Sequence, residues 1–121
     1  MLLVDAANVV GSRPDGWWRD RPGAARDLVT RVRRAVVDGA LAGPVVIVLE
    51  GQAKQGVEEG LDDGVEVVHA PGHGDDTLAA VAAERDDPVV LVSADRDLGV
   101  RVRRSGARVV GPTWLLERLP S

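Results

Sequence analysis

Four aspartates stand at places in the chain where a carboxylate could help to bind a cation: Asp5, Asp75, Asp95 and Asp97. The first follows an apolar run at residues 2–4, and the last two follow an apolar run at residues 89–92. Carboxylate oxygens are the ligands that Mg²⁺ and Mn²⁺ prefer. Such ions bind phosphate oxygens and activate water. The pattern therefore indicates a metal site suited to phosphate chemistry.

The elements that must position these aspartates can be predicted from the apolar pattern. Dense runs of Val, Leu and Ile are typical of parallel strands buried on both faces, and they predict strands at 2–4, 45–49, 65–68, 89–92 and 108–110. Helical spacing predicts helices that begin at Pro22, Leu98 and Pro112, and a further helix with Asp75 as its N-cap. Residues 6–21 are predicted as a loop, and residues 52–64 as a loop with room for one short helical turn. We expect one domain over residues 1–121, a three-layer α/β/α fold with a central parallel sheet.

This fold would bring the aspartates together. The carboxyl ends of parallel strands meet at one edge of the sheet, where open α/β sheets place their ligands. Neighbouring strands are about 4.7–4.9 Å apart, so acids that end adjacent strands can share one cation. A single Asp at a strand end or helix start is most often only a cap, as Asp75 or Asp76 alone would be. Capping is a weaker explanation for acids at three separate strand ends.

Composition narrows the classes of function. The chain of 121 residues contains no Cys, which excludes disulfides, thiol catalysis and thiolate zinc sites. No apolar run approaches the length of a membrane span, and residues 2–4 suggest a strand rather than a leader segment. We therefore expect a cytoplasmic protein that does not bind membranes. The oligomeric state is left open, with a homodimer as one candidate.

The net charge of −4 does not exclude nucleic acid as a partner. Without Asp5, Asp75, Asp76, Asp95 and Asp97, the formal charge of the chain would be +1. A cation bound among these acids would offset their charge, and the remainder would not repel phosphate. All basic residues except Lys54 are Arg, the better bidentate phosphate partner, although a GC-rich coding bias explains this equally well.

Three motifs resemble those of NYN domains, the PIN-like nucleases that include the YacP group. Residues 3–9 (LVDAANV) resemble the DxxN opening of these domains. Residues 74–78 (GDDTL) are similar to the start of their central acidic helix, and residues 92–98 (VSADRDL) to their S/T-x-D-x-D/E segment. The motifs stand in the family's order and span the chain from residue 2 to about residue 118.

The resemblance implies a PIN-like fold with Rossmann-like topology and the five predicted strands in the order 3-2-1-4-5. It implies a ribonuclease that uses Mg²⁺ or Mn²⁺, and we expect single-stranded RNA as its substrate. By this resemblance Asp5, Asp75 and Asp95 are metal ligands, and Asp97 is a ligand directly or through water. Asn8 would orient the site or contact the scissile phosphate, although it could equally cap a turn. Between Asp75 and Asp76 we favour Asp75, because it lies three residues before the inward-facing Leu78.

Several other residues are secondary candidates. Ser93 either anchors its loop or orients a ligand, and Arg96 either holds a phosphate or neutralises its acidic neighbours. Glu50 ends a strand at the same edge, where a solvated acid is the simpler interpretation. The pair Trp17-Trp18 could stack on bases, but a hydrophobic plug is favoured. His69 and His73 are separated by Pro71-Gly72, so they cannot form a helical zinc pair.

Two alternative functions remain open. One is a Toprim-like phosphotransfer or nuclease domain with Glu50 as its acid and Asp95 and Asp97 as its DxD motif, which leaves Asp5 and Asp75 without a role. The other is a PIN-like module that binds RNA or a protein without cleaving it. An intact set of mutually repelling acids argues against the second alternative.

Overall fold

The structure of the protein is a computed structural model, and it describes residues 1–120. Its centre is a six-stranded sheet in the order β3-β4-β2-β1-β5-β6. All strands are parallel except β3, which pairs antiparallel with β4. The strands are β1 (Leu2–Asp5), β2 (Val45–Leu49), β3 (Gly60–Asp62), β4 (Val65–His69), β5 (Val90–Val92) and β6 (Arg108–Val110). Apart from the edge strand β3, this is the predicted order.

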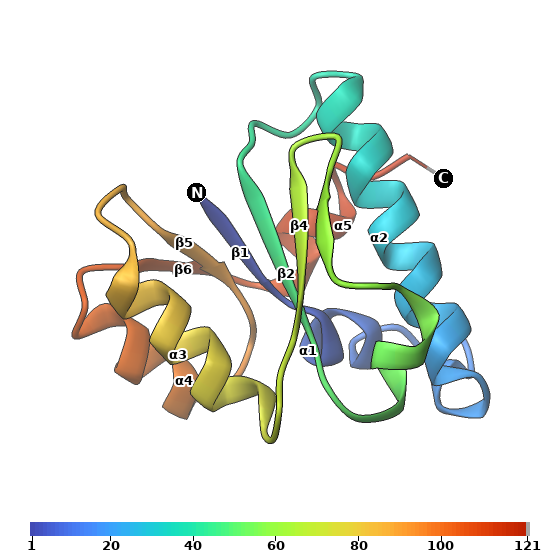
Figure 1. Cartoon of the computed structure of the whole chain (residues 1–121), viewed down its shortest axis with the longest axis horizontal. Helices are drawn as coiled ribbons and strands as arrows, with labels where there is room; N and C mark the ends of the chain where they lie inside the picture. The colour runs from blue at the N-terminus through green and yellow to red at the C-terminus, as the bar shows by residue number, and fades with distance from the viewer. Residues whose placement is uncertain (121) are drawn as a thin grey trace.

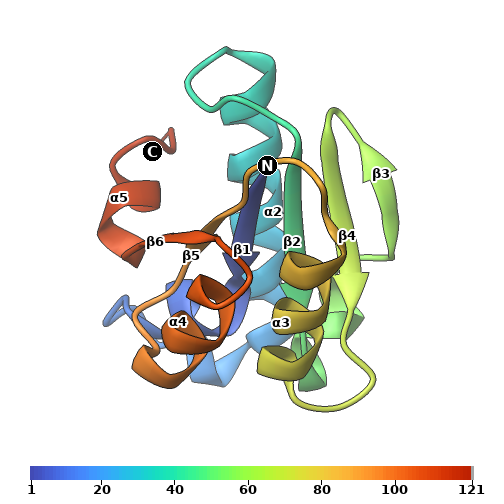
Figure 2. The same cartoon turned by 90° about the vertical axis from the view of Figure 1, so that its left-hand side faces the viewer.

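Helices cover both faces of the sheet (Figures 1 and 2). Side chains from α1, α2 and α5 share one apolar core with the sheet, and side chains from α3 and α4 share the other. The predicted three-layer α/β/α class is therefore confirmed. The helices are α1 (Ala6–Gly11), α2 (Arg21–Val37), α3 (Gly74–Glu84), α4 (Arg96–Arg103) and α5 (Pro112–Leu116), with short 3₁₀ helices η1 (Trp17–Arg19) and η2 (Gly51–Gly56).

The sheet forms where sequence patterning places it because its central strands are buried on both sides. All four residues of β1 and all five of β2 are buried. Successive residues alternate between the two cores: Leu3 joins the core under α3 and α4, whereas Val4 joins the core under α2. Continuous aliphatic sequence is the signature of such strands.

Two segments predicted as loops contain regular structure. Residues 6–21 include α1 and η1, because α1 starts directly after β1 with Asp5 as its N-cap. That helix has six residues, which is too short to show an apolar period. In residues 52–64, most of η2 is the short helical turn that the prediction allowed, whereas β3 was not predicted, because its three residues are exposed and carry no apolar alternation. The helix predicted to begin at Leu98 begins two residues earlier, at Arg96.

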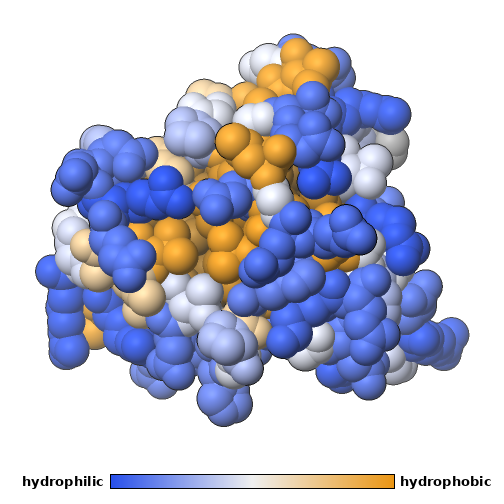
Figure 3. Space-filling model, viewed as in Figure 1, coloured by the Kyte–Doolittle hydropathy of each residue, from blue (hydrophilic) through white to orange (hydrophobic). Residues whose placement is uncertain are grey.

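In the part of the chain that the structure describes, no helix has the length and apolar character needed to cross a membrane. Apolar and hydrophilic residues are not evenly mixed on the surface. Figure 3 shows apolar residues gathered in the middle of one face, with hydrophilic residues around them.

The packing of η2 against α2 depends on Gly56. A Cβ atom built on Gly56 would overlap the backbone carbonyl of Pro22, and the carbonyl of Gly56 accepts a hydrogen bond from Arg26 Nε at 3.2 Å. Backbone cannot yield as a flexible side chain can. We therefore expect Gly56→Ala to lower the free energy of unfolding by about 1–3 kcal/mol, measured by chemical denaturation.

Gly72→Ala is the matched control, because a Cβ there meets nothing within 4 Å. This variant should keep the wild-type stability or gain up to about 1 kcal/mol. Equal stability of the two variants would contradict the close approach of η2 to α2.

Candidate functional site

The carboxyl edge of the sheet brings Asp5 and Ser93 side by side. The register of β1 and β5 pairs Val4 with Val92, so the next residues along the two strands are neighbours. Two residues earlier on the same strands, Leu3 and Leu91 belong to the core under α3 and α4, so strand alternation directs Asp5 and Ser93 to that same face. Ser93 Oγ donates a hydrogen bond to Asp5 Oδ2 at 2.8 Å, and both residues are buried, with exposures of 2% and 8%.

One hydrogen bond holds the loop after β5 against the start of α1, and two more shape the connection from β5 to α4. The amide of Ala94 donates to Asn8 Oδ1 at 2.8 Å. The amide of Asp95 donates to Ser93 Oγ at 3.1 Å, and Asp95 Oδ1 in turn accepts from the amide of Leu98 at 3.1 Å. Asp95 is therefore the N-cap of α4, and Asn8 fixes the backbone that leads to it. Asn8 also donates its own amide to Asp5 Oδ1 at 3.4 Å.

Glu50 has a larger part in this edge than sequence reasoning gave it. It follows β2, is half-buried, and accepts a hydrogen bond at Oε2 from the amide of Gly74 at 3.0 Å. Gly74 is the first residue of α3, so a carboxylate from another strand satisfies an amide at that helix's amino terminus. The signal was present in the sequence: in the strand order 3-2-1-4-5, Glu50 follows the strand next to that of Asp5 and lies at the same edge of the sheet.

The pKa of Asp5 is raised above its ordinary value. Burial is the largest cause, because it disfavours the charged carboxylate. The hydrogen bonds from Ser93 and from the Asn8 amide lower the pKa, and the negative charges of Glu50 and Asp95 raise it again. Asp5, Glu50 and Asp95 therefore form an electrostatically coupled acidic group.

The structure places the remaining predicted acids farther out. Asp75 was predicted as the N-cap of α3, but the N-cap is His73, and Asp75 and Asp76 lie exposed in the first turn. Asp76 forms an ion pair with Arg101 of α4 at 3.1 Å. Of the two aspartates, Asp75 is therefore the one that forms no ion pair within residues 1–120. Asp97 is exposed in the first turn of α4.

The last points concern Arg96 and the spacing of the possible metal ligands. Arg96 is exposed at the start of α4. Within residues 1–120, no three His, Asp or Glu side chains are grouped closely enough, as arranged, to hold a metal ion. The structure thus joins Asp5 and Asp95 as expected and adds Glu50, whereas Asp75 and Asp97 are not among the causes of the raised Asp5 pKa.

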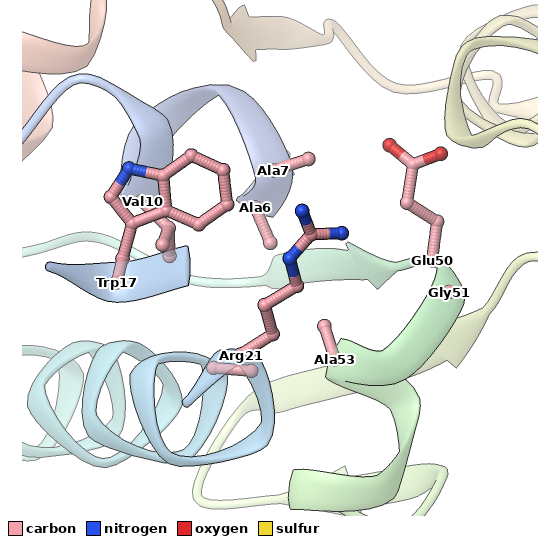
Figure 4. Close-up of a pocket in the computed structure, with 9 residues that line it drawn as sticks. Ala6, Ala7, Val10, Trp17, Arg21, Glu50, Gly51 and Ala53 are labelled. Atoms are coloured by element: carbon pink, nitrogen blue, oxygen red, sulfur yellow. The ribbon is translucent and has the colours of Figure 1, made fainter. Parts of the chain in front are cut away.

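A cavity of about 240 Å³ opens beside this edge, on the side of α1 and α2 (Figure 4). Trp17, Arg21 and Glu50 contribute its large side chains, and small residues form much of the rest. Trp17 is half-buried, whereas its neighbour Trp18 is 53% exposed and does not line the cavity. His69 does not line this cavity, and its ring Nε2 lies 2.7 Å from the carbonyl oxygen of Val57.

The fold defines an α/β protein whose mainly parallel sheet carries an acidic group at its carboxyl edge. No family model matches the sequence, and no curated protein matches it. Among solved structures, the fold is similar to the crystal structure of Rae1 (YacP) from Bacillus subtilis. The TM-score is 0.72 at 18% identity, over 97% of this chain and 71% of that one. The W164L mutant of the same protein gives a TM-score of 0.71 at 20% identity, over 96% and 72% of the two chains.

The raised pKa of Asp5 makes its contribution to stability depend on pH. The folded protein binds the Asp5 proton more tightly than the unfolded chain, so this residue costs stability as the pH rises through and above the unfolded value of about 4. We expect Asp5→Asn, measured without divalent metal, to gain stability relative to the wild type at pH 7. The gain should shrink as the pH falls through the raised pKa of folded Asp5, because the folded wild type then takes up a proton before the unfolded chain does.

Comparing the two proteins at each pH cancels the titration of the other carboxylates. Urea denaturation at several pH values between 4 and 7 makes this comparison. A stability difference that stays constant over the range, or that favours the wild type most at pH 7, would contradict the electrostatic cost assigned to Asp5.

Proposed function

We propose that the protein is a metal-dependent ribonuclease that hydrolyses phosphodiester bonds in single-stranded RNA. One observation carries the proposal. A buried carboxylate, Asp5, lies at the end of the central strand with its pKa raised by burial and by the charges of Glu50 and Asp95. The fold likeness to Rae1 (YacP) agrees with it, because the sequence motifs independently resemble the PIN-like nucleases that include the YacP group.

The donor set suits a hard divalent cation. Asp5, Asp95 and Glu50 offer only oxygen ligands, and their mutual repulsion would be relieved by Mg²⁺ or Mn²⁺. In this proposal Asp5 and Asp95 hold the ion, with Asp75 as a third ligand and Asp97 acting directly or through water. Such an ion supplies an activated water and neutralises charge on the scissile phosphate.

The residues around these acids have positioning roles in the proposal. Ser93 donates to Asp5 and accepts from the amide of Asp95, so its hydroxyl links the two strands that carry the principal ligands. Asn8 uses Oδ1 to fix the Ala94 amide, which leaves its side-chain NH₂ as the group to donate to a phosphate oxygen. Exposed Arg96 lies between two proposed ligands in the chain and can attract the RNA backbone.

Two broader expectations stay predictions, a cytoplasmic location and the single-stranded form of the RNA, and the oligomeric state stays open with a homodimer as one candidate.

Cleavage of a labelled single-stranded RNA should require Mn²⁺ or Mg²⁺ and should stop on chelation with EDTA. We expect Asp95→Asn to reduce the cleavage rate by more than about 100-fold, because loss of a ligand exceeds the roughly 10- to 100-fold typical of a group that only orients one. The stability of the metal-free variant should equal or exceed that of the wild type. Asp38→Asn is the matched control: Asp38 is exposed at the C-terminal end of α2, outside this edge, and the variant should keep wild-type activity.

The same variants separate the alternatives. Activity that survives Asp5→Asn but not Glu50→Gln would favour the Toprim-like assignment. RNA binding that is unaltered by Asp95→Asn, with no metal-dependent cleavage by the wild type, would favour a binding module and would contradict the proposal.

A further inference from the structure

The cavity of Figure 4 adjoins the acidic group and shares one residue, Glu50, with it. Ala6 and Ala7 line the cavity and stand between Asp5 and Asn8 in the chain. Glu50 belongs to both regions, because it lines the cavity and also acts on the pKa of Asp5. A group bound in the cavity would therefore lie next to the proposed scissile phosphate.

The cavity combines an aromatic ring, a cation and an anion. The guanidinium carbon of Arg21 lies 5.4 Å from the centroid of the Trp17 ring, in a cation–π contact. Figure 4 shows the guanidinium reaching into the space between the Trp17 ring and the Glu50 carboxylate. Glu50 Oε2 accepts a hydrogen bond from the Gly74 amide. The other carboxylate oxygen, Oε1, can accept a hydrogen bond from a ligand. The remaining wall, largely Ala and Val, offers no further charge.

Resting on the proposed ribonuclease function, we propose that this cavity binds one unpaired nucleobase of the RNA, next to the phosphate that is cut, with guanine preferred. A base stacks on the Trp17 indole. Guanine presents acceptors, O6 and N7, that match the donor fork of Arg21. Its exocyclic amine is a donor that matches Glu50.

Size and charge favour a base over other ligands. The volume of about 240 Å³ is below the roughly 300–1,000 Å³ of sites for drug-sized ligands, so it suits a single ring system. A phosphate or carboxylate group would meet Arg21 but would also face Glu50, whose charge repels it. A neutral, flat group with a donor edge and an acceptor edge satisfies both side chains.

The test measures binding of two fluorescently labelled RNA hexamers by anisotropy, one of uridines alone and one with a single guanosine. All measurements are made in EDTA, so binding is read without cleavage. The wild type should bind the guanosine hexamer more tightly, by roughly 5- to 150-fold. Trp17→Ala should weaken that binding by roughly 5- to 150-fold, and Arg21→Gln should remove most of the preference for guanosine.

Trp18→Ala is the matched control, because Trp18 is the adjacent indole, is more exposed and does not line the cavity. It should change binding less than 2-fold. Ala53→Leu, which keeps Trp17 and fills the cavity, should weaken binding as Trp17→Ala does, and it serves if that variant fails to fold. Equal binding of the two hexamers, or equal losses for the Trp17 and Trp18 variants, would overturn the inference.

The two proposals fail in different ways. If Trp17→Ala loses binding in EDTA but the wild type never cleaves RNA with Mn²⁺, the base pocket stands and the ribonuclease function fails. If metal-dependent cleavage occurs and the Trp17 and Ala53 variants bind the guanosine hexamer as the wild type does, the ribonuclease function stands and the base pocket is rejected.

Discussion

The site depends on one constraint: a carboxylate is buried at the end of the central strand. Asp5 lies between β2 and β5, where its charge is costly, and its pKa is raised as a result. Two hydrogen bonds offset part of the cost, one from the Ser93 hydroxyl and one from the Asn8 amide. These contacts determine how the loop after β5 meets the start of α1. The hydrogen bonds at this edge of the sheet therefore begin at the Asp5 carboxylate.

Helix amino termini explain how further acids can gather on the same side. The residues of α3 and α4 pack on one face of the sheet, and both helices begin at its carboxyl edge (Figure 2). Glu50 accepts from the first amide of α3, and Asp95 caps α4. The positive ends of two helix dipoles thus favour carboxylates where a cluster would otherwise repel itself. The proposed cation would complete this balance.

Sequence alone predicted the elements whose pattern is long and buried. The strand at 45–49 is observed with the same bounds as β2, because continuous aliphatic sequence has few other uses in a protein of this size. The strand order came from the family resemblance and holds for the five predicted strands. The six-residue α1 and the exposed β3 were missed because neither is long enough or buried enough to leave a period in the sequence.

The site was predictable in part for a related reason. Asp5 and Asp95 end adjacent strands, so topology alone brings them together. The N-cap of α3 was predicted wrongly. Its first amide donates to Glu50, which is 24 residues away in the chain, and rules for helix capping consider only residues next to the helix. Asp75 and Asp97 stay predictions as metal ligands. The proposed metal site is tested most directly by crystals of the protein grown with Mn²⁺. We expect an anomalous peak coordinated by Asp5 and Asp95, and occupied Mn²⁺ sites with none at Asp5 would contradict the proposal.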